Sequence, residues 1–261
     1  MIGSIGSRED ERLARAAVEA LVAGVDLTPR PGLAGGRRTD GGDLRWSAEA
    51  LAPGLAAAAA VARRVGEPSA ALRIELGAVG RSTERTMARA DGGRVLHHGA
   101  VWPLGLLVAG AALAPRGTAE EVTAFAGRIA AHPDRRAPRT PTPGSAVSVR
   151  YGAAGAKGEA RAGFPHVRRA LAALDTARHA GAREPEARIN ALLAVMTTLQ
   201  DTGLLHTAGL YGLREVQDGA RDVAEGRLSL DDFDRRLRER GLRPRGSGHL
   251  LAAALFLDGR R

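Results

Sequence analysis

Residues that favour β-sheets are scarce in this chain, and this scarcity restricts the fold more than any other feature. Aromatic residues make up 3% of the 261 residues, while Ala, Leu and Arg recur throughout. Apolar residues instead return at helical spacing, and Gly or Pro separates the successive segments. We therefore predict one all-α domain over residues 1–261, a compact multi-helix bundle. The expected helices span 8–25, 46–65 with a break at Pro53, 70–90, 99–114, 118–131, 166–180, 186–200, 209–224, 229–240 and 249–257.

The composition limits the class of function. A formal charge of +9 and a pI near 11.2 suggest an anionic partner, although abundant Arg and Ala can also reflect a GC-rich genome. Two Trp and two Tyr offer little base stacking, so nucleic acid is not the expected partner. The absence of cysteine excludes disulfides and thiolate chemistry. No signal-peptide pattern is present, and the apolar run 100–114 is shorter than the ~20 residues of a membrane span. We expect a cytoplasmic protein without a membrane partner.

Five glycine-rich segments between the expected helices carry charged or hydroxyl residues. They are 28–46, 91–99, 152–165, 201–209 and 243–249. Helix N-termini that follow such turns bind phosphates through free N–H groups and the helix dipole. None of the five matches the P-loop or the dinucleotide fingerprint, so each could also be a plain turn. The Pro-rich stretch 132–150 is typical of a linker between two lobes or of a mobile loop.

Several blocks of the sequence resemble one enzyme family. They are Pro29-Arg30-Pro31-Gly32-Leu33, Gly92-Gly93 with His97-x-Gly99-Ala100, the segment from Tyr151 through Lys157-Gly158-Glu159-Ala160 to Pro165, Asp201-Thr202-x-Leu204-Leu205-His206, and Pro244-x-Gly246-Ser247. In this order they are similar to the triphosphoribosyl-dephospho-CoA synthases, closest to the branch that serves malonate decarboxylase. The resemblance spans residues 10–257 and implies an all-helical fold.

The resemblance also implies a reaction and a set of site residues. The family joins C1 of the ATP ribose to the 2′-hydroxyl of 3′-dephospho-CoA and releases adenine. Such a substitution needs a base, an acid and charge stabilisation at an oxocarbenium-like carbon. It implies Mg²⁺ for the triphosphate, ATP and a CoA-like acceptor as partners, and allows a homodimer. The implied catalytic residues are Asp201, Glu84, Glu159 and His206, of which Glu84 and Asp201 could hold the metal. The implied phosphate contacts are Arg30, Arg37, Gly92, Gly93, His97, Lys157, Gly158, Gly246 and Ser247.

Each of these residues also has a structural interpretation. The carboxylates could be solvated helix ends, the histidines buried hydrogen-bonded side chains, and the lysine and arginines surface groups. The sequence also departs from the family pattern at Asp43, Arg45, Arg94 and His249, where the charge or its sign changes. Arg94, Arg245 and His98 could add positive charge around a triphosphate. A paralogue with another acceptor and a non-catalytic nucleotide-binding protein therefore stay open as alternatives.

Overall fold

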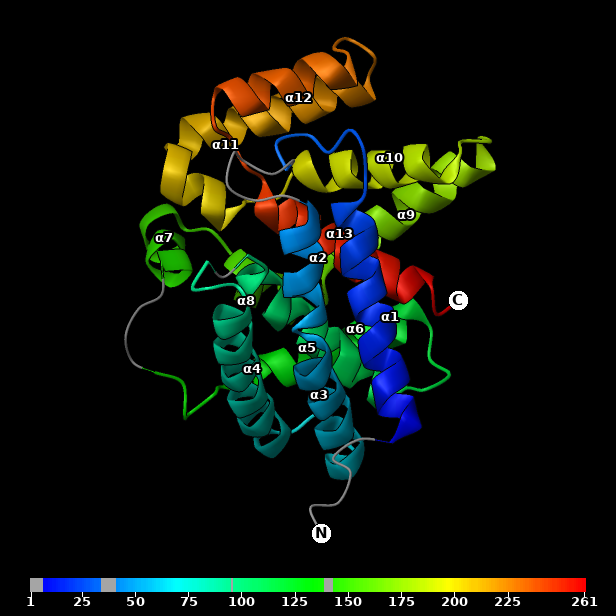
Figure 1. Cartoon of the computed structure of the whole chain (residues 1–261), viewed down its shortest axis with the longest axis vertical. Coiled ribbons are helices and arrows are strands. Elements are labelled where there is room, and N and C mark those ends of the chain that lie inside the picture. Colours follow the sequence, from blue (N-terminus) through cyan, green and yellow to red (C-terminus); the bar gives the residue numbers. More distant parts are fainter. Residues whose placement is uncertain (1–6, 34–40, 95, 139–142) are drawn as a thin grey trace.

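The computed structural model describes residues 7–33, 41–94, 96–138 and 143–261, and throughout these ranges the ordered elements are helices, without strands. This confirms the predicted all-α fold (Figure 1). In chain order the helices are α1 (Arg8–Val25), α2 (Gly41–Glu49), α3 (Ala52–Val65), α4 (Ala70–Ala90), α5 (His98–Leu113), α6 (Ala119–Ala131), α7 (Pro143–Tyr151), α8 (Gly155–Arg161), α9 (Pro165–His179), α10 (Glu184–Met196), α11 (Thr202–Ala224), α12 (Leu230–Glu239) and α13 (Arg245–Asp258).

Helix α5 forms the centre of the bundle. Its residues from Leu106 to Ala112 are all buried, and α1, α3, α4, α6 and α13 pack around it. The crossing with α6 is close because Gly110 has no side chain: a Cβ there would lie 2.6 Å from the backbone oxygen of Val122. The predicted buried helix over 99–114 is thus confirmed, and it supports the site at its N-terminal end.

Local capping chemistry fixes several helix starts. Ser7 and Asp10 form a capping box at α1, and Thr118 and Glu121 form another at α6. The Ser229 hydroxyl accepts a hydrogen bond from the backbone N–H of Asp232, 3.1 Å away, as the sequence predicts. Such caps satisfy backbone donors that a helix leaves unpaired at its first turn.

The structure corrects the predicted loops. Residues 46–65 form two helices, because α2 ends at Glu49 and Pro53 occupies the first turn of α3. The predicted linker 132–150 contains the start of α7, which packs against α11; residues 139–142 lie outside the described ranges. The predicted loops 28–46, 152–165, 201–209 and 243–249 likewise contain helix, namely α2, α8 and the starts of α11 and α13. Helix α11 bends at Gly209, whose backbone is not helical (φ 63°, ψ −164°).

Helix α13 lies in the middle of the molecule (Figure 1). It runs between α1 and the α9–α10 pair and also contacts α5 (Figure 1). The hairpin of α11 and α12 lies at one end, where the carboxylate of Asp234 accepts a hydrogen bond from the backbone N–H of Gly32. As a result, the N-terminal ends of α5, α8, α11 and α13 meet near the turn that follows α1.

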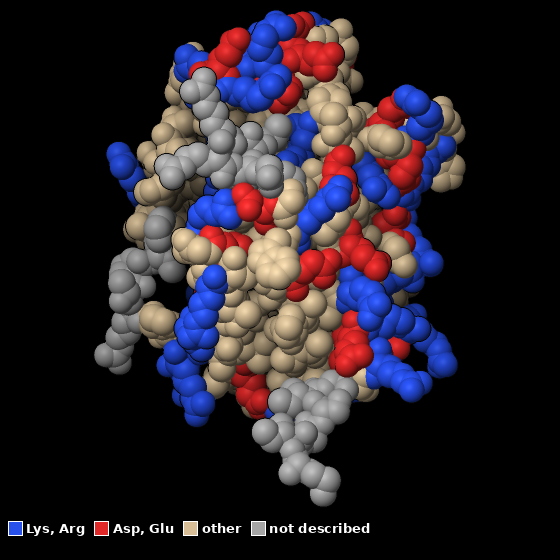
Figure 2. Space-filling view, viewed as in Figure 1, with Lys and Arg blue, Asp and Glu red and all other residues tan. Residues whose placement is uncertain are grey.

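Charged side chains of both signs are interspersed on the face seen in Figure 2, without one continuous basic patch there. Many belong to ion pairs, such as Arg178 with Asp258 and Arg63 with Asp10. Within the described ranges, none of the helices has the length and apolar character needed to cross a membrane.

Candidate active site

A cavity of about 560 Å³ opens where four helix N-termini meet. Its polar groups come from α5, α8, α11 and α13, and apolar side chains such as Leu96, Phe164 and Leu250 complete the wall. We call it the large cavity. Four residues that the sequence singled out line it: Glu159, Asp201, His206 and Gly246. Segments that are far apart in the sequence therefore converge on one space.

Asp201 is a buried carboxylate at the start of α11. One oxygen accepts hydrogen bonds from the backbone N–H groups of Gly203 and Leu204, at 2.8 and 3.3 Å. The other accepts from Gly246 N–H at 2.8 Å, which ties α11 to α13. Burial raises the pKa of Asp201, although these backbone donors favour its ionised form. Asp201 is therefore both a helix cap and a buried carboxylate in the wall of the large cavity.

Glu159 is the second buried carboxylate of the large cavity. Its oxygens pair with the backbone N–H of His166, at 2.9 Å, and with His166 Nδ1, at 2.7 Å. These bonds cap α9, whose preceding residue Phe164 has a left-handed backbone (φ 56°) and offers no side-chain cap. The sequence did not indicate the role of His166, because its distance from Glu159 depends on the turn between α8 and α9.

The other carboxylate candidate, Glu84, lies elsewhere. It lines a separate cavity of about 340 Å³ between α3, α4 and α5. Its Oε1 atom is 3.6 Å from Nε2 of His98, which lines the large cavity. Glu84 and Asp201 thus face different cavities. Glu84 reaches the large cavity only indirectly, through its contact with His98.

The carboxylates do not form a ready-made metal site. In the ranges that the structure describes, no group of three or more His, Cys, Asp or Glu residues is arranged to hold a metal ion. Both oxygens of Asp201 already accept backbone hydrogen bonds. Mg²⁺ needs few protein ligands when phosphates supply the others.

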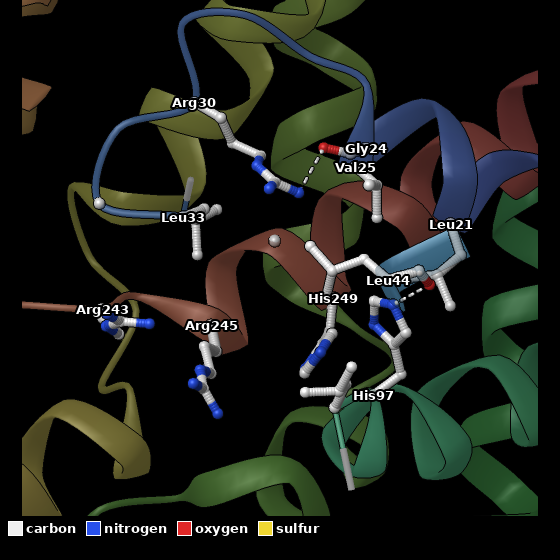
Figure 3. Close-up of a pocket in the computed structure, with 13 residues that line it drawn as sticks. Leu21, Gly24, Val25, Arg30, Leu33, Leu44, His97, Arg243, Arg245 and His249 are labelled. Atoms are coloured by element: carbon white, nitrogen blue, oxygen red, sulfur yellow. Dashed lines mark hydrogen bonds between the residues drawn. The ribbon is translucent and has the colours of Figure 1, made fainter. Parts of the chain in front are cut away.

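A second, smaller cavity of about 80 Å³ adjoins the first, and we call it the basic cavity (Figure 3). Arg30 reaches it from the turn after α1, His97 from the residue before α5, and Arg243, Arg245 and His249 from the start of α13. The two cavities share Leu96, Arg245 and His249 in their walls. Carboxylates are absent from the described residues that line the basic cavity.

Two imidazoles face each other in the basic cavity. The rings of His97 and His249 are 6.1 Å apart in an edge-to-face arrangement. Desolvation, together with nearby His97, Arg245 and His98, lowers the pKa of His249 to about 3. Burial also lowers the pKa of His97, which is 5% exposed. Gly99 makes room for this pair, since a Cβ there would lie 2.6 Å from Nδ1 of His249.

The remaining predicted phosphate contacts lie outside or beside these cavities. Gly92 and Gly93 form the exposed turn that ends α4, with φ angles of 58° and 85°. Lys157 is exposed on α8, and Gly158 packs beside Ala154. Ser247 is buried in the first turn of α13. Arg37 lies outside the described residues. Arg243 was not predicted, and the basic turn that contains it was the only signal in the sequence.

Two residues that depart from the family pattern pair with each other. Arg94 forms a two-pronged ion pair with Asp43, at 2.6 and 2.9 Å. Arg45, which also departs from the pattern, binds Asp26 at 2.7 Å. One ion pair thus joins the turn after α4 to α2, and the other joins α2 to the end of α1. None of the four side chains belongs to the described walls of either cavity.

Comparison with known proteins identifies the family. The sequence profile of the ATP:dephospho-CoA triphosphoribosyl transferases matches residues 10–261. A protein of Pseudomonas aeruginosa (strain UCBPP-PA14), named a probable 2-(5''-triphosphoribosyl)-3'-dephosphocoenzyme-A synthase, is 46% identical over 95% of this chain and 90% of its own. A protein of the same name from Azotobacter vinelandii is 45% identical over 95% and 91%. No solved structure matches. The chain belongs to the ATP:dephospho-CoA triphosphoribosyl transferase family.

Proposed function

We propose that this protein transfers the triphosphoribosyl group of ATP to the 2′-hydroxyl of 3′-dephospho-CoA and releases adenine. The observation that carries the proposal is the convergence of Glu159, Asp201 and His206 on one large cavity, next to a cavity lined by cations. The family match supports the choice of substrates. The product would serve as the precursor of the acyl-carrier prosthetic group of malonate decarboxylase.

The reaction breaks the bond between ribose C1 and the adenine nitrogen and forms a bond from C1 to the acceptor oxygen. The acceptor hydroxyl loses its proton, and the departing adenine gains one. Positive charge develops at C1 in the transition state, and a carboxylate in a poorly hydrated site stabilises such charge more strongly than one in water. We assign this role to Asp201, with Glu159 as the second negative group.

His206 lies at the exposed part of the same wall, on the first turns of α11. An imidazole there can serve as the acid that protonates the departing adenine. Asp201 lines the same wall as a candidate base for the acceptor's proton, and burial raises the pKa of its carboxyl. Glu84 would act at a distance, by orienting His98.

Mg²⁺, a homodimer and a cytoplasmic location belong to the same proposal. Mg²⁺ would enter as the ATP complex, neutralising the triphosphate, because the described carboxylates offer no separate metal cluster. Sedimentation of the purified protein would test the dimer.

The direct test is mass spectrometry of adenine released from ATP and Mg²⁺, with and without 3′-dephospho-CoA. Adenine together with an adduct that carries the triphosphoribosyl mass establishes the reaction. Adenine release that depends on another acceptor would instead support a divergent paralogue. ATP binding without adenine would indicate a nucleotide-binding protein that does not catalyse the transfer.

A further inference from the structure

The basic cavity collects basic side chains from three separate parts of the chain, and no described acidic side chain lines it. Arg30, Arg243 and Arg245 contribute guanidinium groups, and His97 and His249 contribute imidazoles (Figure 3). An anion in this cavity would offset the mutual repulsion of the three guanidinium groups. We propose that the basic cavity is the subsite for the terminal phosphate of ATP, an assignment that rests on the proposed function.

Unpaired polar atoms in the wall support this assignment. Nε2 of His97 lies 2.9 Å from the backbone oxygen of Leu44, so Nε2 carries the proton and Nδ1 is the free acceptor. Nδ1 of His97 and Nε of Arg30 are buried and have no hydrogen-bond partner among the described residues. A buried polar atom without a partner costs free energy, and a hydrogen phosphate ion offers both an acceptor and a donor.

Among the described residues, Arg30 makes one weak hydrogen bond. Its Nη1 atom lies 3.5 Å from the backbone oxygen of Gly24, and burial lowers the pKa of its guanidinium. Asp26 attracts Arg30 from a distance but is itself paired with Arg45 at 2.7 Å. Arg30 therefore has donors to offer, and arginine binds phosphate oxygens through two parallel hydrogen bonds.

The connection between the cavities favours a terminal phosphate. Arg245 and His249 belong to both walls, so the two cavities are neighbours. A ligand that occupies both would place its terminal phosphate in the basic cavity. At about 80 Å³ the basic cavity is far smaller than its neighbour, at about 560 Å³. The triphosphate of ATP ends in a free phosphate group. The diphosphate of dephospho-CoA instead carries a bulky group on each side, which the small cavity does not accommodate.

The first experiment measures binding of inorganic tripolyphosphate by calorimetry, without ATP or acceptor. We expect Arg30→Gln and Arg243→Gln each to weaken binding by about tenfold. Arg243 is exposed, so its variant should fold even if Arg30→Gln does not. Arg15→Gln is the matched control, because Arg15 is exposed on α1 and lines neither cavity. Absent binding, or equal affinity in all four proteins, would overturn the subsite.

The second experiment identifies the source of the phosphate. Saturating tripolyphosphate should abolish ATP binding and leave the affinity for 3′-dephospho-CoA unchanged. Competition with 3′-dephospho-CoA alone would overturn the assignment to ATP. These binding measurements need no turnover. A failure of the subsite would therefore show as altered binding, whereas a failure of the proposed function would show as ATP binding without adenine release.

Discussion

The two adjoining cavities are built from many of the same segments but differ in charge. The large cavity contains the buried carboxylates of Asp201 and Glu159, whereas the basic cavity has only cationic or imidazole groups among its described polar side chains. A transferase that breaks a ribose bond while holding a triphosphate needs both environments. Negative groups stabilise the developing positive carbon, and positive groups hold the phosphates. This difference predicts that mutations in the basic cavity weaken the binding of ATP, whereas mutations of the carboxylates slow the transfer reaction.

The largest effect is expected for Asp201→Asn. The variant keeps the size of the side chain but removes its charge, and we expect kcat for adenine release to fall by about 10² to 10³, as for loss of one transition-state contact. The amide nitrogen would also face a backbone N–H, which should lower the free energy of unfolding by about 1–3 kcal/mol. Steady-state kinetics and urea denaturation measure the two effects.

Asp10→Asn is the matched control for Asp201→Asn. Asp10 is a buried carboxylate in the capping box of α1 and lines neither cavity. The Asp10→Asn variant should be less stable than the wild type, while its kcat stays near the wild-type value. Equal losses of kcat in both variants would mean that Asp201 acts only through stability.

The next effect concerns the pH dependence of stability. The pKa of His249 is about 3 in the folded protein, against 6.5 for an unperturbed histidine, so the unfolded chain binds a proton first as the pH falls. The free energy of unfolding should therefore decrease below about pH 7, by up to about 1.4 kcal/mol per pH unit. Between pH 7 and pH 5, we expect the free energy of unfolding of His249→Gln to decrease by about 2 kcal/mol less than that of the wild type.

Urea denaturation at several pH values measures this slope. His179→Gln is the control, because His179 is exposed on α9. The account of the basic cavity predicts that tripolyphosphate reduces the slope in the wild type, since a bound anion favours the protonated imidazole. If the free energy of unfolding of His249→Gln depended on pH as steeply as that of the wild type, the lowered pKa of His249 would be contradicted.

A smaller effect is expected for Gly99→Ala. The added methyl group would meet the ring of His249 at 2.6 and 2.8 Å, so the ring must shift within the basic cavity. We expect KM for ATP to rise by about fivefold while kcat changes little, since uniform binding is lost. Gly105→Ala on the same helix is the control, because its Cβ would meet no atom within 4 Å. A kcat loss without a KM change would place His249 in the chemistry instead.

The smallest effect is expected for Lys157→Met. Lys157 is the only lysine in the sequence, and it is exposed on α8. An exposed charge acts through a screened field, so we expect KM for ATP to rise by only about twofold at physiological salt. Initial rates at 20 mM and 300 mM salt, roughly on either side of physiological screening, would detect it. A tenfold increase at both salt concentrations would instead show direct contact with phosphate.

The sequence predicted the helices better than their connections. Spacing and caps identified α1, α4, α5, α6, α9 and α12 closely, because a helix start or an apolar stripe is a local property. Residues 143–151 and 155–161 were expected to be loop, since Gly and Pro near them suggested turns. Whether such short segments become helical depends on what they pack against, and for 143–151 that is α11.

The sequence predicted those site residues that belong to a motif. It did not predict contacts between segments that only the fold brings together. Asp201, Glu159, Arg30 and His97 came from the motifs. The division into two cavities did not, because it depends on how the start of α13 lies against α5. His166 carries no signal of its own, and only the basic turn around it pointed to Arg243. Glu84 faces a different cavity from Asp201.

One measurement tests the central claim most directly: steady-state adenine release as a function of ATP concentration for the wild type, Asp201→Asn and Arg30→Gln, at saturating 3′-dephospho-CoA. The account predicts that Asp201→Asn lowers kcat with nearly constant KM for ATP. Arg30→Gln should raise KM for ATP by about tenfold and largely keep kcat. The same change of kcat and KM in both variants would contradict the division between a cavity for the chemistry and a cavity for the terminal phosphate.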